Sequence, residues 1–367
     1  MLTLDVTHSY PGFQLRVQQA LPSSGITALF GRSGSGKSTL LRVIAGLDAG
    51  AKGRVAWQNE VWQDSNHFTP PHKRGLGFVF QDTRLFPHLT VAQNLAYADT
   101  RAKGLPGPSL DAIIAALDLD PLMSRRPTTL SGGEASRAAI GRALLTRPRM
   151  LLMDEPLAAL DEARKAEILP YLERLRDQIG TPMLYVSHNM AEVARLATHL
   201  MLIDAGRITH HGPIEALLSD PSIAHTLGVR EAGSILCATL TAQDDDGLSQ
   251  LTTSAGPLWL PQVTAPIGSR IRVRLLAQDV ILSRSAPTGL SALNILPATV
   301  TDVRTGDGPG ALVQLRAGDD LILARITRRS ATALGLAVGT RCFAILKSVS
   351  VARGNIGTTP SNPPATL

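Results

Sequence analysis

The sequence of 367 residues lacks the features that mark several classes of protein. It has no run of about 18 uninterrupted apolar residues, which excludes an ordinary transmembrane helix. Its amino terminus, MLTLDVTHSY, has no basic start followed by an apolar stretch, so we expect no signal peptide. The two cysteines, Cys237 and Cys342, match no metal or redox spacing, and a reduced cytoplasmic setting fits them.

Aromatic residues and clustered charge are also scarce. Phe, Trp and Tyr together make up 4% of the chain, which argues against a platform for stacking nucleic-acid bases. The net charge of +6 is scattered along the sequence, which favours solubility over a nucleic-acid groove. We therefore predict no nucleic-acid partner. The length and the 44% of hydrophobic residues predict a globular protein with two or three domains.

Short apolar runs recur in the first part of the chain and end abruptly in polar residues. Such runs are typical of strands buried in a largely parallel sheet, and they lie at 26–30, 75–80, 150–153, 182–187 and 199–204. Helical patterns lie between them at 38–47, 132–145 and 162–179, and Pro170 is a candidate kink in the last. This alternation predicts an α/β domain over residues 1–218, with ligands at the carboxyl ends of the strands.

The pattern changes after residue 218. Residues 219–234 have the composition of a linker. Short alternating strands separated by Gly, Pro and Asp turns then occupy 235–355 and predict a small β-barrel or sandwich. The Pro- and Thr-rich end, 356–367, is predicted to be disordered.

A glycine-rich motif follows the first buried run and opens a helix. The stretch GRSGSGKST fits G-x-x-x-x-G-K-[ST], in which backbone N–H groups and the helix amino terminus bind phosphate oxygens. Lys37 can bridge the β- and γ-phosphates, and Ser38 can hold Mg²⁺. An ordinary glycine turn is the weaker interpretation. The predicted ATP-binding residues here are Gly31, Arg32, Ser33, Gly34, Ser35, Gly36, Lys37, Ser38 and Thr39.

A second motif, MLLMDEP, ends another buried run with two carboxylates. Asp154 suits contact with Mg²⁺, and Glu155 suits a general base that orients the attacking water. Two acids at a strand end can also be a solvated terminus. The phosphate-binding motif upstream makes the catalytic interpretation much the stronger.

The motif LSGGE at 130–134 is the most specific in the sequence, because two glycines at a helix start leave N–H groups free for a phosphate. Here the chain resembles the ATPases of ABC transporters, over about residues 1–215. The resemblance implies a P-loop NTPase cassette with a helical subdomain at about 85–148. It also implies that Gln81, in FVFQD, contacts Mg²⁺ and assists catalysis, and that His188, in YVSHN, contacts the γ-phosphate.

The resemblance further implies a homodimer in which two cassettes enclose two ATP molecules. The residues that would complete the partner's site are Ser131, Gly132, Gly133 and, in LAALD, Asp161. Tyr10 is the candidate for stacking on adenine, since family members carry an aromatic near there. Phe13 competes for that role, and for either ring a place in the core is an equal alternative.

The motifs depart from the family pattern in two places. After LSGGE the family usually continues Lys-Gln-Arg, whereas this chain has Ala135, Ser136 and Arg137. We expect the helix to persist and any polar contact of the usual glutamine to be weakened. The motif LAALD has Ala158 and Ala159 where a small polar residue is common. Neither change touches the catalytic set, so we predict activity.

The stretch LFPHLTVAQNLAYA at 85–98 resembles the part of prokaryotic importer ATPases on which the membrane subunit docks. Leu85, Phe86 and Leu89 suit an exposed apolar groove there, although an amphipathic core segment is an alternative. The resemblance implies two separate permease subunits, a periplasmic binding protein, and a peripheral position on the cytoplasmic face of the bacterial inner membrane.

The segment from about 288 to 352 resembles the Mop-like type of TOBE domain, a small OB-like all-β fold. SALNILPATV carries its start and AILKSVSVA its end. Ser291, Asn294, Lys347 and Ser348 offer hydroxyl, amide and cationic donors to a tetrahedral oxyanion. Family members usually have an arginine before the asparagine, where this chain has Leu293. A barrel used only for dimer contact therefore stays an equal alternative.

Taken with PPHKRGLGFVFQDTRLFPH and ILPYLERLRDQIGTPMLYVSHN, these motifs are similar to those of the ATPase subunits of bacterial molybdate importers. The expected function is ATP hydrolysis, with Mg²⁺, that drives molybdate import. Import of tungstate or sulfate is the nearest alternative. A soluble ABC ATPase acting on DNA or ribosomes usually has a coiled-coil insertion or a second cassette, and an oxyanion-sensing regulator needs a helix-turn-helix. The sequence shows none of these.

Overall fold

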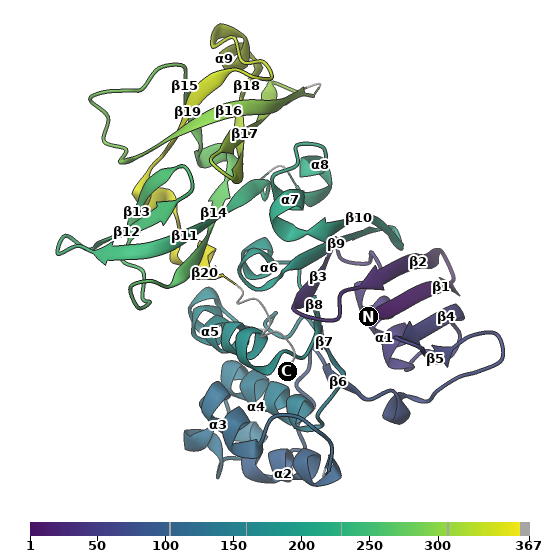
Figure 1. Ribbon diagram of the computed structural model, residues 1–367. Coiled ribbons are helices and arrows are strands. Elements are labelled where there is room, and N and C mark those ends of the chain that lie inside the picture. The colour runs from purple at the N-terminus through teal and green to yellow at the C-terminus, as the bar shows by residue number, and fades with distance from the viewer. Residues whose placement is uncertain (103, 159, 229, 307, 360–367) are drawn as a thin grey trace. The chain divides into compact units, whose positions relative to one another are not determined.

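The computed structural model describes residues 1–102, 104–158, 160–228, 230–306 and 308–359 (Figure 1). The chain forms two compact units. The first comprises Met1–Asn189 and Leu196–His211, and the second comprises Met190–Arg195 and Gly212–Thr359. Within the described ranges, no helix has the length and apolar character needed to cross a membrane.

The first unit is built on a ten-stranded sheet with the order β5-β4-β1-β2-β10-β9-β3-β8-β7-β6. Its strands are β1 (Leu2–Tyr10), β2 (Phe13–Leu21), β3 (Ile26–Phe30), β4 (Lys52–Trp57), β5 (Glu60–Gln63), β6 (Leu76–Val79), β7 (Met150–Asp154), β8 (Met183–Val186), β9 (His199–Asp204) and β10 (Arg207–Pro213).

The half of this sheet that contains β3, β6, β7, β8 and β9 is parallel. All five residues of β3 and all four of β8 are buried, as the apolar runs predict for strands covered on both faces. Because these strands run the same way, their carboxyl ends lie along one edge of the sheet.

The other half of the sheet is mixed and was not expected from the sequence, because β10 pairs with β2 in parallel while the pairs among β1, β2, β4 and β5 are antiparallel. Strand β1 pairs with β2 on one side and β4 on the other. Leu2, Leu4 and Val6 are buried while the residues between them are more exposed, so β1 has one face in the core and one face open.

In the described part of this unit, five α-helices accompany the sheet (Figure 1). They are α1 (Lys37–Ala45), α2 (Val91–Arg101), α3 (Leu110–Leu117), α4 (Gly132–Leu145) and α5 (Glu162–Ile179), with 3₁₀ turns η1 (Pro71–Lys73), η2 (Asp120–Leu122) and η3 (Pro127–Thr129). Helices α2, α3 and α4 lie in the stretch 85–148 that was predicted as a helical subdomain. Helix α5 is a single element that contains Pro170.

The second unit has two antiparallel five-stranded sheets, ordered β13-β12-β11-β14-β20 and β15-β19-β16-β17-β18. The strands are β11 (Gly233–Gln243), β12 (Leu248–Thr253), β13 (Gly256–Pro261), β14 (Arg270–Leu276), β15 (Ile281–Ser283), β16 (Asn294–Thr305), β17 (Gly310–Ala317), β18 (Asp320–Thr327), β19 (Arg341–Leu346) and β20 (Ile356–Thr358). Both sheets contribute to one apolar core, to which Leu236, Val273, Val313 and Ala344 belong. The all-β domain predicted for this region is therefore confirmed.

Short helices complete this part of the chain: α6 (Met190–Leu196), α7 (Ile214–Leu218), α8 (Ala224–Leu227), α9 (Arg328–Ala333), η4 (Ala277–Asp279), η5 (Ser348–Ser350) and η6 (Arg353–Asn355). Three boundaries differ from the predicted ones. Residues 212–218 belong to the second unit, and the predicted linker contains α8 and the first residues of β11. The stretch predicted to be disordered begins with β20, which pairs with β14, while residues 360–367 lie outside the described ranges.

Candidate nucleotide site

The predicted catalytic residues follow four neighbouring strands of the parallel half-sheet. The glycine-rich loop follows β3 and His188 follows β8. Asp154 ends β7, Glu155 comes directly after it, and Gln81 lies two residues beyond β6. In the sheet these strands are consecutive, in the order β3-β8-β7-β6. The topology therefore brings residues from distant parts of the chain to the edge where ligands bind in parallel sheets.

The loop between β3 and α1 needs glycine at two positions. A Cβ on Gly31 would lie 2.2 Å from the carbonyl oxygen of Ile203. This distance is a steric clash with the backbone, so a side chain at this position is excluded. Gly36 has φ +104°, and a Cβ there would lie 2.8 Å from Cζ of Phe13. Arg32, Ser33 and Gly34 are exposed, Ser35 is buried, and Thr39 is partly buried. The loop and the amino terminus of α1 thus form a tight turn of the kind that binds phosphate.

The side chain of Lys37 is folded over this loop. Its Nζ donates hydrogen bonds to the carbonyl oxygens of Gly31 (2.9 Å) and Arg32 (3.0 Å) and lies 4.0 Å from Oε1 of Glu155. Only 6% of the side chain is exposed. The ammonium group therefore lies between the loop and the β7 carboxylates, where it can attract an anion.

Ser38 and Asp154 form the pair expected to bind the metal. The Ser38 hydroxyl donates to Oδ1 of Asp154 at 2.9 Å. Burial raises the pKa of Asp154, a shift that the Ser38 hydrogen bond opposes and the neighbouring Glu155 reinforces. One carboxylate and one hydroxyl are the protein ligands that Mg²⁺ takes when phosphate oxygens and water supply the rest. The residues present therefore fit this ion.

Glu155 and His188 are in direct contact. Oε2 of Glu155 lies 3.1 Å from Nδ1 of His188. The Glu155 backbone has φ +47°, a left-handed conformation that costs a non-glycine residue free energy and that often marks functional sites. The carboxylate thus lies between the ammonium group of Lys37 and the imidazole of His188.

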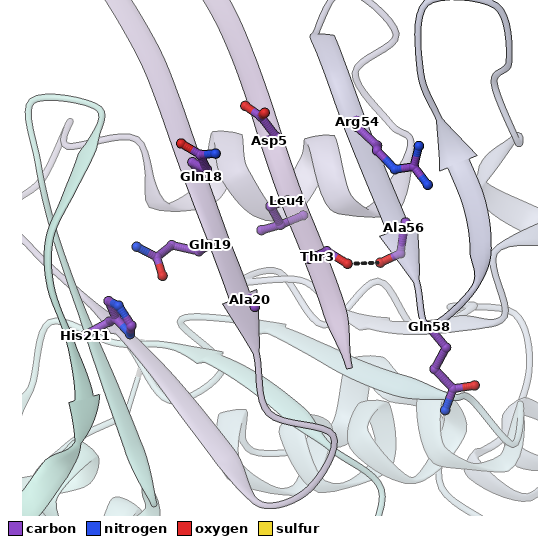
Figure 2. A pocket seen from close by; sticks show the side chains of 10 residues that line it. All are labelled: Thr3, Leu4, Asp5, Gln18, Gln19, Ala20, Arg54, Ala56, Gln58 and His211. Carbon is purple, nitrogen blue, oxygen red and sulfur yellow. Dashed lines mark hydrogen bonds between the residues drawn. The ribbon is translucent and has the colours of Figure 1, made fainter.

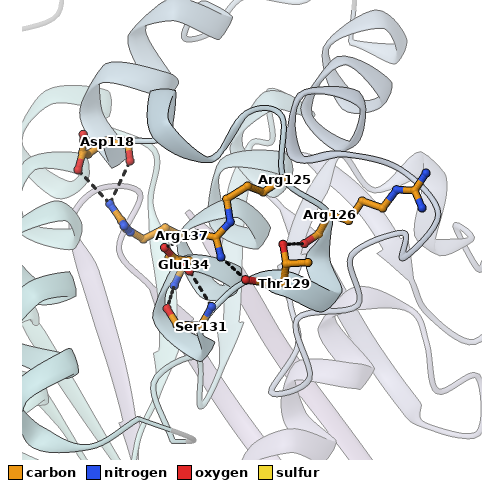
Figure 3. A network of polar contacts seen from close by, with 7 residues as sticks. All are labelled: Asp118, Arg125, Arg126, Thr129, Ser131, Glu134 and Arg137. Atoms are coloured by element: carbon orange, nitrogen blue, oxygen red, sulfur yellow. Dashed lines mark hydrogen bonds and ion pairs between the residues drawn. The ribbon is translucent and has the colours of Figure 1, made fainter.

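The LSGGE motif forms the start of α4 (Figure 3). Ser131 is the N-cap, its hydroxyl accepts from the Glu134 N–H at 3.3 Å, and Glu134 accepts from the Ser131 N–H at 2.7 Å. Arg125 binds Glu134 at 2.9 Å and also donates to the Thr129 carbonyl. Ser131 and Gly132 remain exposed. Gly133 is buried, so the exposed part of this turn is Ser131 and Gly132.

Other polar contacts fix the elements around this turn. The Arg137 guanidinium donates to the carbonyl oxygens of Leu117 (3.0 Å) and Asp118 (3.1 Å) at the end of α3. The carboxylate of Asp161 caps α5 by accepting from the Arg164 N–H at 2.9 Å. Of the two alanines that depart from the family pattern in LAALD, Ala158 is partly buried, and Ala159 lies outside the described residues.

Both candidate adenine-stacking rings lie at the β1–β2 turn. The Tyr10 hydroxyl donates to the Asp48 carboxylate, and the Tyr10 ring lies edge-on to His8 at 4.4 Å between centroids. Tyr10 is 43% exposed, whereas Phe13 is partly buried against Gly36. Phe13 therefore packs on the phosphate-binding loop, and Tyr10 is the ring with a free face.

The contact between Tyr10 and Asp48 was missed by the sequence reasoning. Asp48 follows the glycine that ends α1, and no motif marks it. The capping pair Ser131 and Glu134 was also missed, although Ser-x-x-Glu before a helix is a signal that could have predicted it.

One part of the predicted docking surface is not exposed. Leu85 is 8% exposed and belongs to the core, so it cannot contribute to a groove. Phe86 and Leu89 are partly buried. The guanidinium of Arg142 lies 5.1 Å from the Phe86 ring centre, and the buried Asn94 side chain holds the Phe86 backbone through its N–H (2.9 Å) and carbonyl (3.2 Å).

In the second unit, two of the four predicted oxyanion ligands come together. Asn294 is fully buried, and its amide accepts from the Trp259 N–H (2.7 Å) and donates to the Trp259 carbonyl (2.9 Å) and the Ser348 hydroxyl (3.2 Å). Ser291 and Lys347 are exposed. The amide of Asn294 therefore joins β16 to β13 and η5.

A hollow of about 560 Å³ lies elsewhere, across the other half of the sheet (Figure 2). Thr3, Asp5, Gln18, Arg54 and His211 are among its lining residues. These side chains come from β1, β2, β4 and β10, not from the strand ends described above. The hollow is thus separate from the predicted ATP-binding residues.

Comparisons with protein families identify the same two parts of the chain. The family model of ABC transporters matches residues 16–158, and that of the TOBE domain matches residues 290–352. A nucleotide-free ATP-binding cassette from an ABC transporter is 27% identical in sequence with a TM-score of 0.51, covering 61% of this chain and 97% of that chain.

Curated relatives are similar over nearly the full length. The molybdenum import ATP-binding protein ModC of Thiobacillus denitrificans is 50% identical over 345 residues, 93% of this chain and 95% of that protein. The protein of the same name from Methylococcus capsulatus is 48% identical over 344 residues, 93% and 96% of the two chains. That of Pseudomonas aeruginosa is 46% identical over 357 residues, 95% and 99%. This chain therefore belongs to the ABC transporter ATPases, in the family of molybdenum import ATP-binding proteins, and carries a TOBE domain.

Proposed function

We propose that this protein hydrolyses ATP and that the hydrolysis drives import of molybdate through a separate membrane permease. The observation that carries the proposal is the meeting of Lys37, Asp154, Glu155 and His188 around one phosphate-binding loop. Membership of a family whose relatives are named for molybdenum import supports the choice of cargo. No observation favours tungstate or sulfate over molybdate.

Each residue at the strand ends has a distinct role in the proposed hydrolysis. Lys37 and the loop N–H groups hold the β- and γ-phosphates. Glu155 orients the attacking water and accepts its proton, and His188, which touches Glu155, contacts the γ-phosphate. Ser38, Asp154 and Gln81 would hold Mg²⁺. When bound, that ion neutralises charge on the phosphate oxygens.

The active form that we propose is a homodimer. In it the turn from Ser131 to Gly133 of one chain, of which Ser131 and Gly132 are exposed in the single chain, faces the ATP bound by the partner, together with Asp161. The ordered capping box at Ser131 supports this, because a rigid helix start presents N–H groups to a phosphate without reorganising. Tyr10, with its free ring face, is the proposed stacking partner of adenine.

We further propose that the dimer is a peripheral subunit on the cytoplasmic face of the bacterial inner membrane. It would bind two permease subunits that receive molybdate from a periplasmic binding protein. The partly buried Phe86 and Leu89, braced by Asn94 and Arg142, are the proposed permease contacts.

For the TOBE domain we keep two roles. Ser291, Asn294, Lys347 and Ser348 would bind an oxyanion, or the domain would serve contact between the two copies. The hydrogen bonds of Asn294 to Trp259 favour the second role in a single chain, because they occupy the amide group.

The test of the proposal is uptake into proteoliposomes that contain this chain, its permease and its binding protein. We expect labelled molybdate to accumulate only with internal ATP, and an excess of unlabelled molybdate, but not sulfate, to compete. Equal competition by sulfate would overturn the cargo and leave the ATPase. The Lys37→Ala variant is the matched control and should take up nothing.

A further inference from the structure

Ser136 links the signature helix to the turn that carries Glu155. It lies in α4, and only 2% of its surface is exposed. Its hydroxyl donates to the carbonyl oxygen of Pro156 at 3.0 Å. Pro156 directly follows Glu155 in the chain. The hydrogen bond therefore ends one peptide away from the predicted catalytic carboxylate.

The backbone of Glu155 needs such support. At φ +47° it is in the left-handed region, which is unfavourable for a non-glycine residue. Conformations of this kind persist only where several contacts hold them. The Glu155 N–H donates to the Val186 carbonyl (3.1 Å), and the Ala158 N–H donates to the Glu155 carbonyl (3.1 Å). The Ser136 hydroxyl holds the next carbonyl along the turn.

The side chain of Glu155 depends on this turn for its direction. Its two carboxylate oxygens lie 4.0 Å from Nζ of Lys37 and 3.1 Å from Nδ1 of His188. A small rotation of the peptide between Glu155 and Pro156 would move the carboxylate relative to both. A misplacement of about 1 Å at a reacting group costs on the order of a hundredfold in rate.

We propose that Ser136 is a positioning residue for Glu155: its buried hydroxyl fixes the Pro156 carbonyl and so holds the Glu155 carboxylate in its working direction. This inference rests on the proposed function, in which Glu155 is the general base. It also explains the serine that replaces the usual glutamine of the family. Ser136 still makes a polar contact, and its partner is the Pro156 carbonyl next to Glu155.

The test compares Ser136→Ala with Thr146→Ala in the full-length chain. Thr146 ends the same helix, and its hydroxyl likewise donates to a backbone carbonyl, that of Ala143 at 2.7 Å. Both variants lose one hydroxyl, so the melting temperature of each reports the purely structural cost. We expect Ser136→Ala to lower kcat for ATP roughly tenfold to a hundredfold and to leave KM within about twofold. Thr146→Ala should leave both constants near the wild-type values.

A conservative variant and a reference variant complete the design. Ser136→Thr keeps the hydroxyl, and we expect its kcat to stay within about threefold of wild type. Glu155→Gln tests the function on which the inference rests, and its hydrolysis should be almost absent. If Glu155→Gln still hydrolysed ATP, the proposed function would fail. If Glu155→Gln were inactive but Ser136→Ala kept the wild-type kcat, the positioning role would be wrong. It would also be wrong if the kcat of Thr146→Ala or of Ser136→Thr fell as far as that of Ser136→Ala.

Discussion

The hydroxyl of Ser38 lies 2.9 Å from the carboxylate of Asp154, although 116 positions separate them in the chain. Ser38 lies in the first turn of α1 and Asp154 ends β7, so the pair joins the glycine-rich loop region to the strand beside the proposed catalytic base. We predict that Asp154→Asn, which keeps the oxygen that accepts from Ser38, lowers Mg²⁺-dependent ATP hydrolysis by at least about a hundredfold. The measurement is the hydrolysis rate across a Mg²⁺ titration. If high Mg²⁺ fully restored the activity of the variant, Asp154 would not be an essential ligand of the ion.

Although Asp154→Asn should lower ATP hydrolysis, the same substitution should raise the stability of the fold at neutral pH. Burial raises the pKa of Asp154 above the value in the unfolded chain, so ionising this carboxyl costs folding free energy. The cost is absent at acid pH, where the group is protonated in both states. It grows as the pH rises above the unfolded pKa and is complete above the folded pKa. Asp154→Asn should therefore melt at a higher temperature than wild type at neutral pH, and the two should converge at acid pH in calorimetry.

His188→Ala should separate binding from hydrolysis. The imidazole touches Glu155 and is predicted to contact the γ-phosphate, but it is 60% exposed and supports no core. We expect hydrolysis to fall about a hundredfold to ten-thousandfold, the range for a general acid–base group, with ATP binding unchanged in a fluorescent-nucleotide assay. A parallel loss of binding would show that the histidine holds ATP in the ground state.

Tyr10 and Phe13 can be distinguished by the Michaelis constant for ATP. Stacking on a base contributes about 1–3 kcal/mol, so loss of the stacking ring should raise KM about tenfold with little change in kcat. We predict this for Tyr10→Ala and a much smaller change for Tyr10→Phe, which keeps the ring and loses only the bond to Asp48. If Phe13→Ala raised KM more than Tyr10→Ala, then Phe13 would be the adenine platform.

Asn294→Ala tests whether that residue is structural or binds the cargo. It removes a fully buried amide that is hydrogen-bonded to the backbone N–H and carbonyl of Trp259. We therefore expect the free energy of unfolding of the second unit to fall by about 2–3 kcal/mol. ATP hydrolysis should be unchanged, and the exposed Ser291→Ala should alter neither property. A stable Asn294→Ala variant that had lost molybdate binding in calorimetric titration would instead support the oxyanion role.

The motifs of the nucleotide site could be predicted because their backbone requirements are local. Gly36 has φ +104°, which favours glycine whatever surrounds it, and a buried apolar run followed by Asp154 and Glu155 is typical of a parallel strand. Strand order then brings such ends together. The fold of the parallel half-sheet followed from the same signal.

Residues whose role depends on distant backbone could not be predicted. The type of Asn294 suits an oxyanion ligand, yet its partner is the backbone of Trp259, 35 positions away. Leu85 is indistinguishable in sequence from an exposed docking residue, and only packing shows it to be buried. Ser136 was expected to weaken the polar contact of the usual glutamine, since no local pattern reveals the Pro156 carbonyl beside it.

The most direct test of the account is Glu155→Gln, studied in one sample for both ATP hydrolysis and assembly. Glutamine keeps the shape of the side chain and loses the proton acceptor beside His188. We predict that hydrolysis falls at least about a hundredfold while ATP is retained and shifts the chain from monomer to dimer in analytical ultracentrifugation. Hydrolysis within a few-fold of wild type would contradict the assignment of Glu155 as the base. An inactive variant that stayed monomeric with ATP would contradict the shared site at the dimer interface.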